Sequence, residues 1–241
     1  MGSEMCIRDR CEEYRKAIAL DSTFGLAYYR LAYAYTWGHA VELAKKPLAK
    51  AIELIDRIPT KEKYLLRALS ANIEKGRAAA IPVVKEMERY YPDDKEMLFY
   101  IGDLSYHEYQ HQQAIEYFEK VLAIDPSHER TLLHLPSAYN RTNQHEKVES
   151  ALERLAKLNP GKALEEKGSY FFSQGEYEIA LEVYRQSLKV DSTDWNVFQM
   201  MAFSYARMGR FEQALESAQQ WQKRISIART YWIVYEGHML L

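Results

Sequence analysis

Small residues return along this chain about every 34 positions, and this spacing limits the folds that the chain can adopt. One row contains Ala32, Ala68, Gly102, Gly168 and Ala202, and a second contains Ala44, Ala80, Ala114, Ala180 and Ala214. With Pro136 and Val148 filling the gaps, the successive offsets are 36, 34, 34, 32 and 34. A period of this length predicts a stack of similar supersecondary units rather than one globular core.

The clearest copy of the unit, residues 95–128, resembles a tetratricopeptide repeat, which is a pair of helices joined by a turn. Its apolar residues recur at spacings of three and four, so they lie on one face of each helix. Gly102 and Ala114 are small where the two helices approach closely, and Phe118 fills the space beside them. The resemblance implies an all-α fold, a right-handed superhelical solenoid of antiparallel helix pairs.

The repeat divides the chain into units of nearly constant length. We expect a half repeat at 11–24, six repeats at 25–60, 61–94, 95–128, 129–160, 161–194 and 195–228, and a half repeat at 229–241. The residue before a proline disfavours helix, so second helices should end at Tyr91-Pro92, Asp125-Pro126 and Asn159-Pro160. Gly175 and Gly209 stand where a first helix must turn into a second.

The first residues do not fit the repeat. Residues 2–9, GSEMCIRD, resemble a translated sequencing adapter. We interpret residues 1–10 as foreign, because they stand where the first helix paired with 11–24 should lie. We therefore expect the natural protein to extend further towards its N-terminus.

Composition excludes several functional classes. The net charge is -2, and no basic stripe is present, which argues against nucleic-acid binding. No apolar run reaches the roughly 18 residues of a membrane span. Cys6 and Cys11 have neither disulfide-framework nor zinc spacing, which fits a reducing compartment and predicts a cytoplasmic protein.

One motif of catalytic appearance is present. His107-Glu108-Tyr109-Gln110-His111 matches HExxH, which binds zinc only where both histidines share one face of a continuous helix. The repeat places the turn between the two helices inside this motif, so the histidines should be separated. Phosphate-binding loops and nucleophile motifs are absent from the sequence. We therefore expect no catalytic residue, metal or cofactor.

In the tetratricopeptide family, first helices line the concave face of the superhelix. The resemblance therefore implies a groove for a protein or peptide, with aromatic anchors and a basic centre. The candidate contact residues are Tyr29, Tyr33, Trp37, Phe99, Tyr100, Asp103, Tyr106, His107, Arg130, His134, Asn140 and Arg141. In later repeats the same projection gives Glu165, Ser169, Phe172, Gln199, Phe203 and Arg207. The alternative is that the aromatics pack between repeats and that the arginines are only solvated.

The class of partner stays open. Co-chaperone repeats hold a chaperone's terminal carboxylate with a Lys and an Asn on one first helix. The matching pairs here are Tyr29 with Tyr33, Phe99 with Asp103 and Leu133 with Ser137, so this clamp is absent. The leading interpretation is a non-catalytic protein-interaction module. The alternative is the sensory or scaffolding region of a bacterial signalling protein whose kinase, cyclase or winged-helix domain is missing.

The last residues are unusually apolar. Residues 229–241, RTYWIVYEGHMLL, carry large apolar side chains on more than one helical face. Terminal repeats normally have a polar outer face. We therefore expect either that the natural chain continues beyond them or that this end self-associates.

Overall fold

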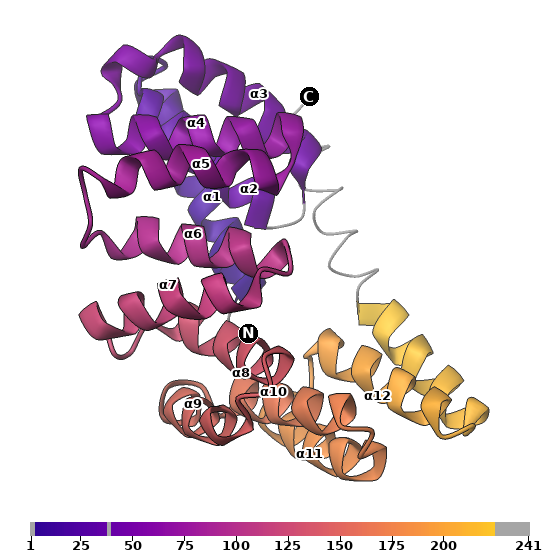
Figure 1. Ribbon diagram of the computed structural model, residues 1–241. Helices are drawn as coiled ribbons and strands as arrows, with labels where there is room; N and C mark the ends of the chain where they lie inside the picture. Colours follow the sequence, from indigo (N-terminus) through magenta and orange to yellow (C-terminus); the bar gives the residue numbers. More distant parts are fainter. Residues whose placement is uncertain (1–2, 38–39, 225–241) are drawn as a thin grey trace. The chain divides into compact units, whose positions relative to one another are not determined.

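The computed structural model describes residues 3–37 and 40–224, and this part of the chain is built from helices without a strand (Figure 1). Residues 229–241, for which the sequence predicted a continuing chain or self-association, lie outside it, as do residues 1–2. The helices fall into two compact units, one ending at Pro126 and the other beginning at Ser127. Each unit is described separately.

The first unit contains seven α-helices and one short 3-10 helix among its described residues. They are α1 (Ser3–Leu20), α2 (Gly25–Trp37), α3 (Val41–Glu53), η1 (Ile55–Arg57), α4 (Thr60–Lys75), α5 (Arg77–Glu88), α6 (Lys95–His107) and α7 (His111–Ile124). The most extensive packing joins α2 to α3, α4 to α5 and α6 to α7. Since α1 begins at Ser3, it continues without a break from the adapter-like segment into the first repeat-like residues.

The second unit repeats the same arrangement. Its helices are α8 (Glu129–Arg141), α9 (His145–Leu158), α10 (Pro160–Ser173), α11 (Tyr177–Val190) and α12 (Trp195–Arg207), and residues 211–224 are also helical. α8 packs on α9 and α10 on α11, while first helices also meet one another, α8 with α10 and α10 with α12. The predicted all-α fold class, a helical solenoid of paired helices, is confirmed.

Close approach within a pair depends on the small residues. A Cβ atom on Gly102 of α6 would lie 2.7 Å from Cδ1 of Phe118 on α7. A Cβ atom on Gly168 would collide in the same way with the ring of Tyr184 on α11. Phe118 and Tyr184 are both fully buried, so each ring occupies the space that the missing side chain leaves. This explains physically why the row that contains Gly102 and Gly168 keeps small residues.

Successive repeats are joined by apolar contacts. Leu181 and Tyr184 of α11 form a buried cluster with Val197, Met201 and Tyr205 of α12. Leu215 occupies the position equivalent to Leu181 in the last described helix, yet it is 61% exposed, whereas Leu181 is 0% exposed. Leu181 is buried because α12 packs over it.

The turns between paired helices require a left-handed backbone. Gly175 and Gly209, which the sequence predicted at such turns, have φ of 81° and 73°. The equivalent turns after α6 and α8 use Tyr109, with φ of 60°, and Asn143, with φ of 58°. Asn tolerates this conformation, but a bulky residue there is strained. Tyr109 is 78% exposed, so little burial compensates the strain.

Exchanging these two turn residues should therefore shift stability in opposite directions. Tyr109→Asn should raise the free energy of unfolding by about 0.5–1 kcal/mol, and Asn143→Tyr should lower it by a similar amount. Urea denaturation followed by circular dichroism measures both. If Tyr109→Asn were destabilising, the tyrosine ring would be making a contact worth more than its backbone strain.

Candidate functional site

Several aromatic candidates of the first unit are part of its core. Tyr29 on α2 and Phe99 and Tyr100 on α6 are 2%, 0% and 5% exposed. The Phe99 ring packs on Phe118, with centroids 5.9 Å apart. Tyr33 is half-buried, and its ring meets Tyr100 edge-on at 6.3 Å and Tyr29 at 6.2 Å. The free protein thus offers Tyr33 to solvent, whereas the other three rings are packed. The side chain of Trp37 lies outside the described part.

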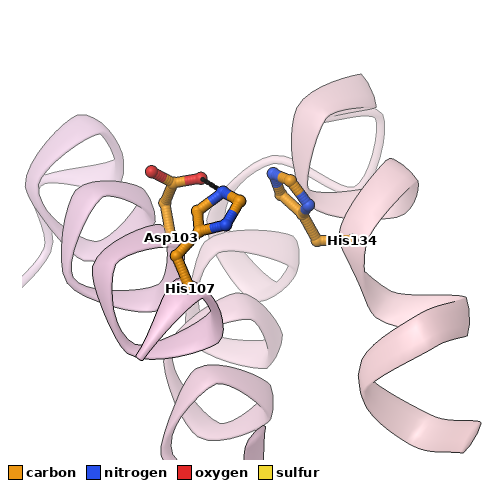
Figure 2. Close-up of side chains that lie close together, drawn as sticks. All are labelled: Asp103, His107 and His134. Atoms are coloured by element: carbon orange, nitrogen blue, oxygen red, sulfur yellow. Dashed lines mark ion pairs between the residues drawn. The ribbon is translucent and has the colours of Figure 1, made fainter. Parts of the chain in front are cut away.

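The end of α6 carries the remaining candidates of this unit. Asp103 and His107 lie one turn apart, with Oδ1 and Nε2 separated by 3.6 Å (Figure 2). The Tyr106 ring lies against the imidazoles of His107, at 5.2 Å, and His111, at 5.6 Å. Tyr106 is half-buried and His107 is exposed. This group is accessible at the turn into α7.

The HExxH motif does not form a helical zinc pair. α6 ends at His107, α7 begins at His111, and Tyr109 between them has a positive φ. The two histidines therefore belong to different helices, as the repeat predicted. This geometry removes the basis for metalloprotease chemistry at the motif, since that chemistry needs one continuous helix.

The predicted basic centre of the second unit lies on α8. Arg130 and His134 are half-buried, and Arg141 is exposed. The His134 side chain is drawn in Figure 2. The side-chain amide of Asn140 is hydrogen-bonded within this unit: its Nδ2 donates to Ser173 Oγ at 2.7 Å, and its Oδ1 accepts from Gln174 at 2.8 Å. Asn140 therefore fastens α8 to the end of α10, and its amide is already engaged on both sides.

A buried charge cluster at the start of α10 is the feature that the sequence did not indicate. Lys162 Nζ lies 2.6 Å from Glu165 Oε2 and 2.9 Å from Asp194 Oδ2. Burial raises the pKa of Glu165, although Lys162 opposes that rise. For Lys162, burial lowers the pKa, but the two carboxylates outweigh it and raise the pKa overall. The spacing of Lys162 and Glu165 was visible in the sequence, whereas Asp194 is brought to them only by the next repeat.

Glu166 follows Glu165 in the sequence, and the charges of this cluster act on its carboxyl group. Burial, followed by the charge of Glu165, raises the pKa of Glu166 to about 8, against the opposing charge of Lys162. An ordinary glutamate titrates at about 4.3. Between about pH 4.3 and about pH 8, the Glu166 carboxyl therefore keeps its proton in the folded state and loses it in the unfolded state. The free energy of unfolding consequently falls as pH rises through this range.

Replacing this carboxyl should therefore stabilise the protein increasingly as pH rises from about 4 to about 8, with the full effect above that range. Glu166→Gln should raise the free energy of unfolding by about 1–2 kcal/mol at about pH 9, allowing for the partial exposure of the side chain, and change it little at about pH 4. The exposed Glu153 provides the control, since Glu153→Gln should have no effect at either pH. Equal stabilisation by Glu166→Gln at both pH values would contradict the assignment.

No helix in the described part of the chain is long and apolar enough to cross a membrane.

Three models of the family described as tetratricopeptide repeat match the chain, at residues 74–129, 105–165 and 161–194. Together they span residues 74–194, about half of the chain. The matched segments include α6–α11 and so contain most of the candidate residues outside α2.

Curated proteins with related sequences are also repeat proteins. The chain is 31% identical over 83 residues to stress-induced-phosphoprotein 1 of Caenorhabditis elegans, which covers 34% of this chain and 26% of that protein. It is 24% identical over 140 residues to the TPR repeat-containing protein YpiA of Bacillus subtilis, covering 56% of this chain and 33% of YpiA. The chain is 29% identical over 111 residues to Hsp70-Hsp90 organizing protein 3 of Arabidopsis thaliana, and the match covers 45% of this chain and 18% of that protein. The chain therefore spans a third or less of the length of these relatives.

Solved structures share the fold at low identity. The thermophilic TPR protein TTC0263 of Thermus thermophilus superposes with a TM-score of 0.59 at 18% identity, covering 76% of this chain and all of that one. A MamA structure superposes with a TM-score of 0.52 at 20% identity, covering 68% of this chain and 97% of that one. The structure of IFIT1 with Gppp-AAAA superposes with a TM-score of 0.56 at 15% identity, covering 87% of this chain and 56% of that one. The sequence matches and the paired-helix fold agree: the chain belongs to the tetratricopeptide repeat family.

Proposed function

We propose that this chain is a non-catalytic interaction module that binds a protein or peptide through the exposed faces of its first helices. The observation that carries the proposal is that these faces keep polar and aromatic side chains accessible while the opposite faces are buried. In the first unit they are Tyr33, Tyr106 and His107, and in the second they are Arg130, His134 and Arg141. Aromatic and arginine side chains are the usual energetic centres of protein interfaces.

A protein partner is favoured over other ligands. The names of two relatives describe them as organizing Hsp70 and Hsp90, which are themselves proteins. The Lys and Asn of the carboxylate clamp are missing here, so we propose a partner other than a chaperone tail. The net charge of -2 speaks against a nucleic acid, although IFIT1 has been solved with Gppp-AAAA on a similar fold. We propose the cytoplasm as the compartment, since the two cysteines lack the spacing of a disulfide framework.

Selection from a random peptide library tests this function. The wild-type chain is used as bait, and the affinities of selected peptides are measured for Tyr106→Ala in the first unit and for Arg130→Glu with Arg141→Glu in the second. At least one of these variants should bind about tenfold more weakly or worse, the scale of interface centres. The matched control reverses the charge of two exposed lysines on the second helices α9 and α11, as Lys157→Glu with Lys189→Glu.

The outcomes separate clearly. If the control weakens binding as much as the first-helix variants do, the peptides do not bind to the first helices. If no peptide is selected, or if selected peptides bind all variants equally, the proposed function is wrong.

A further inference from the structure

Tyr100 of α6 has a buried hydroxyl group without a hydrogen-bond partner. Its side chain is 5% exposed, and no described residue donates to or accepts from the hydroxyl oxygen. A buried polar group left unpaired costs free energy, so natural proteins retain few of them without a reason. The ring itself is well packed, which means that a phenylalanine could fill the same space without this cost.

Side chains of the first helices α2 and α4 lie near the Tyr100 side chain. Tyr33 of α2 meets the Tyr100 ring at an interplanar angle of 88°. The side-chain amide of Asn72, on α4, faces the Tyr100 oxygen and would favour its ionised form, but the two do not reach hydrogen-bond geometry. Burial, then the neighbouring Tyr33, Tyr29 and Asp103, raise the pKa of Tyr100 far above its usual value. The hydroxyl therefore keeps its proton and is available as a donor.

The charges around this point are predominantly acidic. Asp103 acts on Tyr100, and Glu62 and Glu96 act on the adjacent Tyr29. Arg30 offsets part of this, since it lies 3.9 Å from Glu62 and over the Tyr29 ring at 5.3 Å. An acceptor approaching the Tyr100 hydroxyl is favoured if it is uncharged, because a carboxylate would be repelled by these groups.

We propose that Tyr100 donates its hydroxyl hydrogen to a main-chain carbonyl oxygen of an extended partner peptide that lacks acidic side chains at this point. Asn72 lies beside the same carbonyl and offers its amide N–H. Tyr33, which is half-buried, is the side chain that turns aside to admit the peptide, and such rotamer changes are common on binding. This inference rests on the proposed function and assigns it to the inner residues of α2, α4 and α6.

Tyr100→Phe tests the assignment, because it removes the hydroxyl and keeps the ring. The probes are peptides selected on the wild-type chain from the random library. We expect Tyr100→Phe to bind them about tenfold more weakly, the scale of one lost hydrogen bond in a desolvated interface. The melting temperature of the free variant should be unchanged or higher, since an unpaired polar group has been removed.

Tyr117→Phe is the matched control. The Tyr117 hydroxyl on α7 donates to Glu88 at 2.7 Å, so this variant should melt at a lower temperature and bind the peptides with unchanged affinity. If peptides are selected and Tyr100→Phe binds them like wild type, or if Tyr100→Phe destabilises the free protein as Tyr117→Phe does, the inference is overturned while the proposed function stands. A selected pool dominated by acidic peptides also overturns it. If no peptide is selected at all, both fail together.

Discussion

Replacing Phe118 by alanine is expected to lower the free energy of unfolding by about 3–5 kcal/mol, which is the range for truncating a buried aromatic side chain. Phe118 is 0% exposed, packs on the Phe99 ring at 5.9 Å and fills the space left open at Gly102. The cavity opens inside the α6–α7 pair, where two closely packed helices have little freedom to collapse. Urea denaturation of the whole chain, followed by circular dichroism, measures the loss.

Phe211→Ala is the control for the same chemical change at an exposed site. Phe211 is 72% exposed, so its removal should alter stability by no more than about 0.5 kcal/mol. Similar losses for the two variants would mean that the α6–α7 pair is not packed as described.

Replacing Lys162 by methionine is expected to cost about 2–3 kcal/mol at about pH 7. Breaking a buried ion pair leaves an uncompensated charge, here the carboxylates of Glu165 and Asp194, and the estimate allows for the 30% exposure of the Lys162 side chain. Because the raised pKa of Glu165 should rise further once the lysine is removed, the loss should shrink as pH falls and this carboxyl takes up a proton.

The double variant Lys162→Met with Glu165→Gln distinguishes charge from packing. It should recover part of the stability at neutral pH, since one buried carboxylate is gone while the methionine remains. Lys189→Met, at an exposed position of α11, should be neutral. A loss that is the same at every pH and is not relieved by Glu165→Gln would assign the effect to packing alone.

The accessible surface could be predicted only in part. The repeat identified the first helices, and the separation of His107 from His111 followed from the position of the turn. Phe99 and Tyr106 were equally plausible anchors in sequence, yet the first is buried against Phe118 and the second is half-exposed at the helix end. The contact role of the twelve candidate residues stays a prediction, as do the repeat boundaries and the adapter origin of the first residues.

The sequence by itself determined the class of fold. A small residue every 34 positions or so, with apolar residues at spacings of three and four, is sufficient to specify paired helices, because both signals are local properties of one unit. Only the tertiary structure decided which side chains remain available. The Tyr33 ring on α2 contacts the Tyr100 ring on α6, two repeats further along the chain, and Lys162 contacts Asp194 in the next repeat. Such contacts join residues 32 to 67 positions apart, and the path of a side chain between stacked helices depends on packing that no single repeat contains.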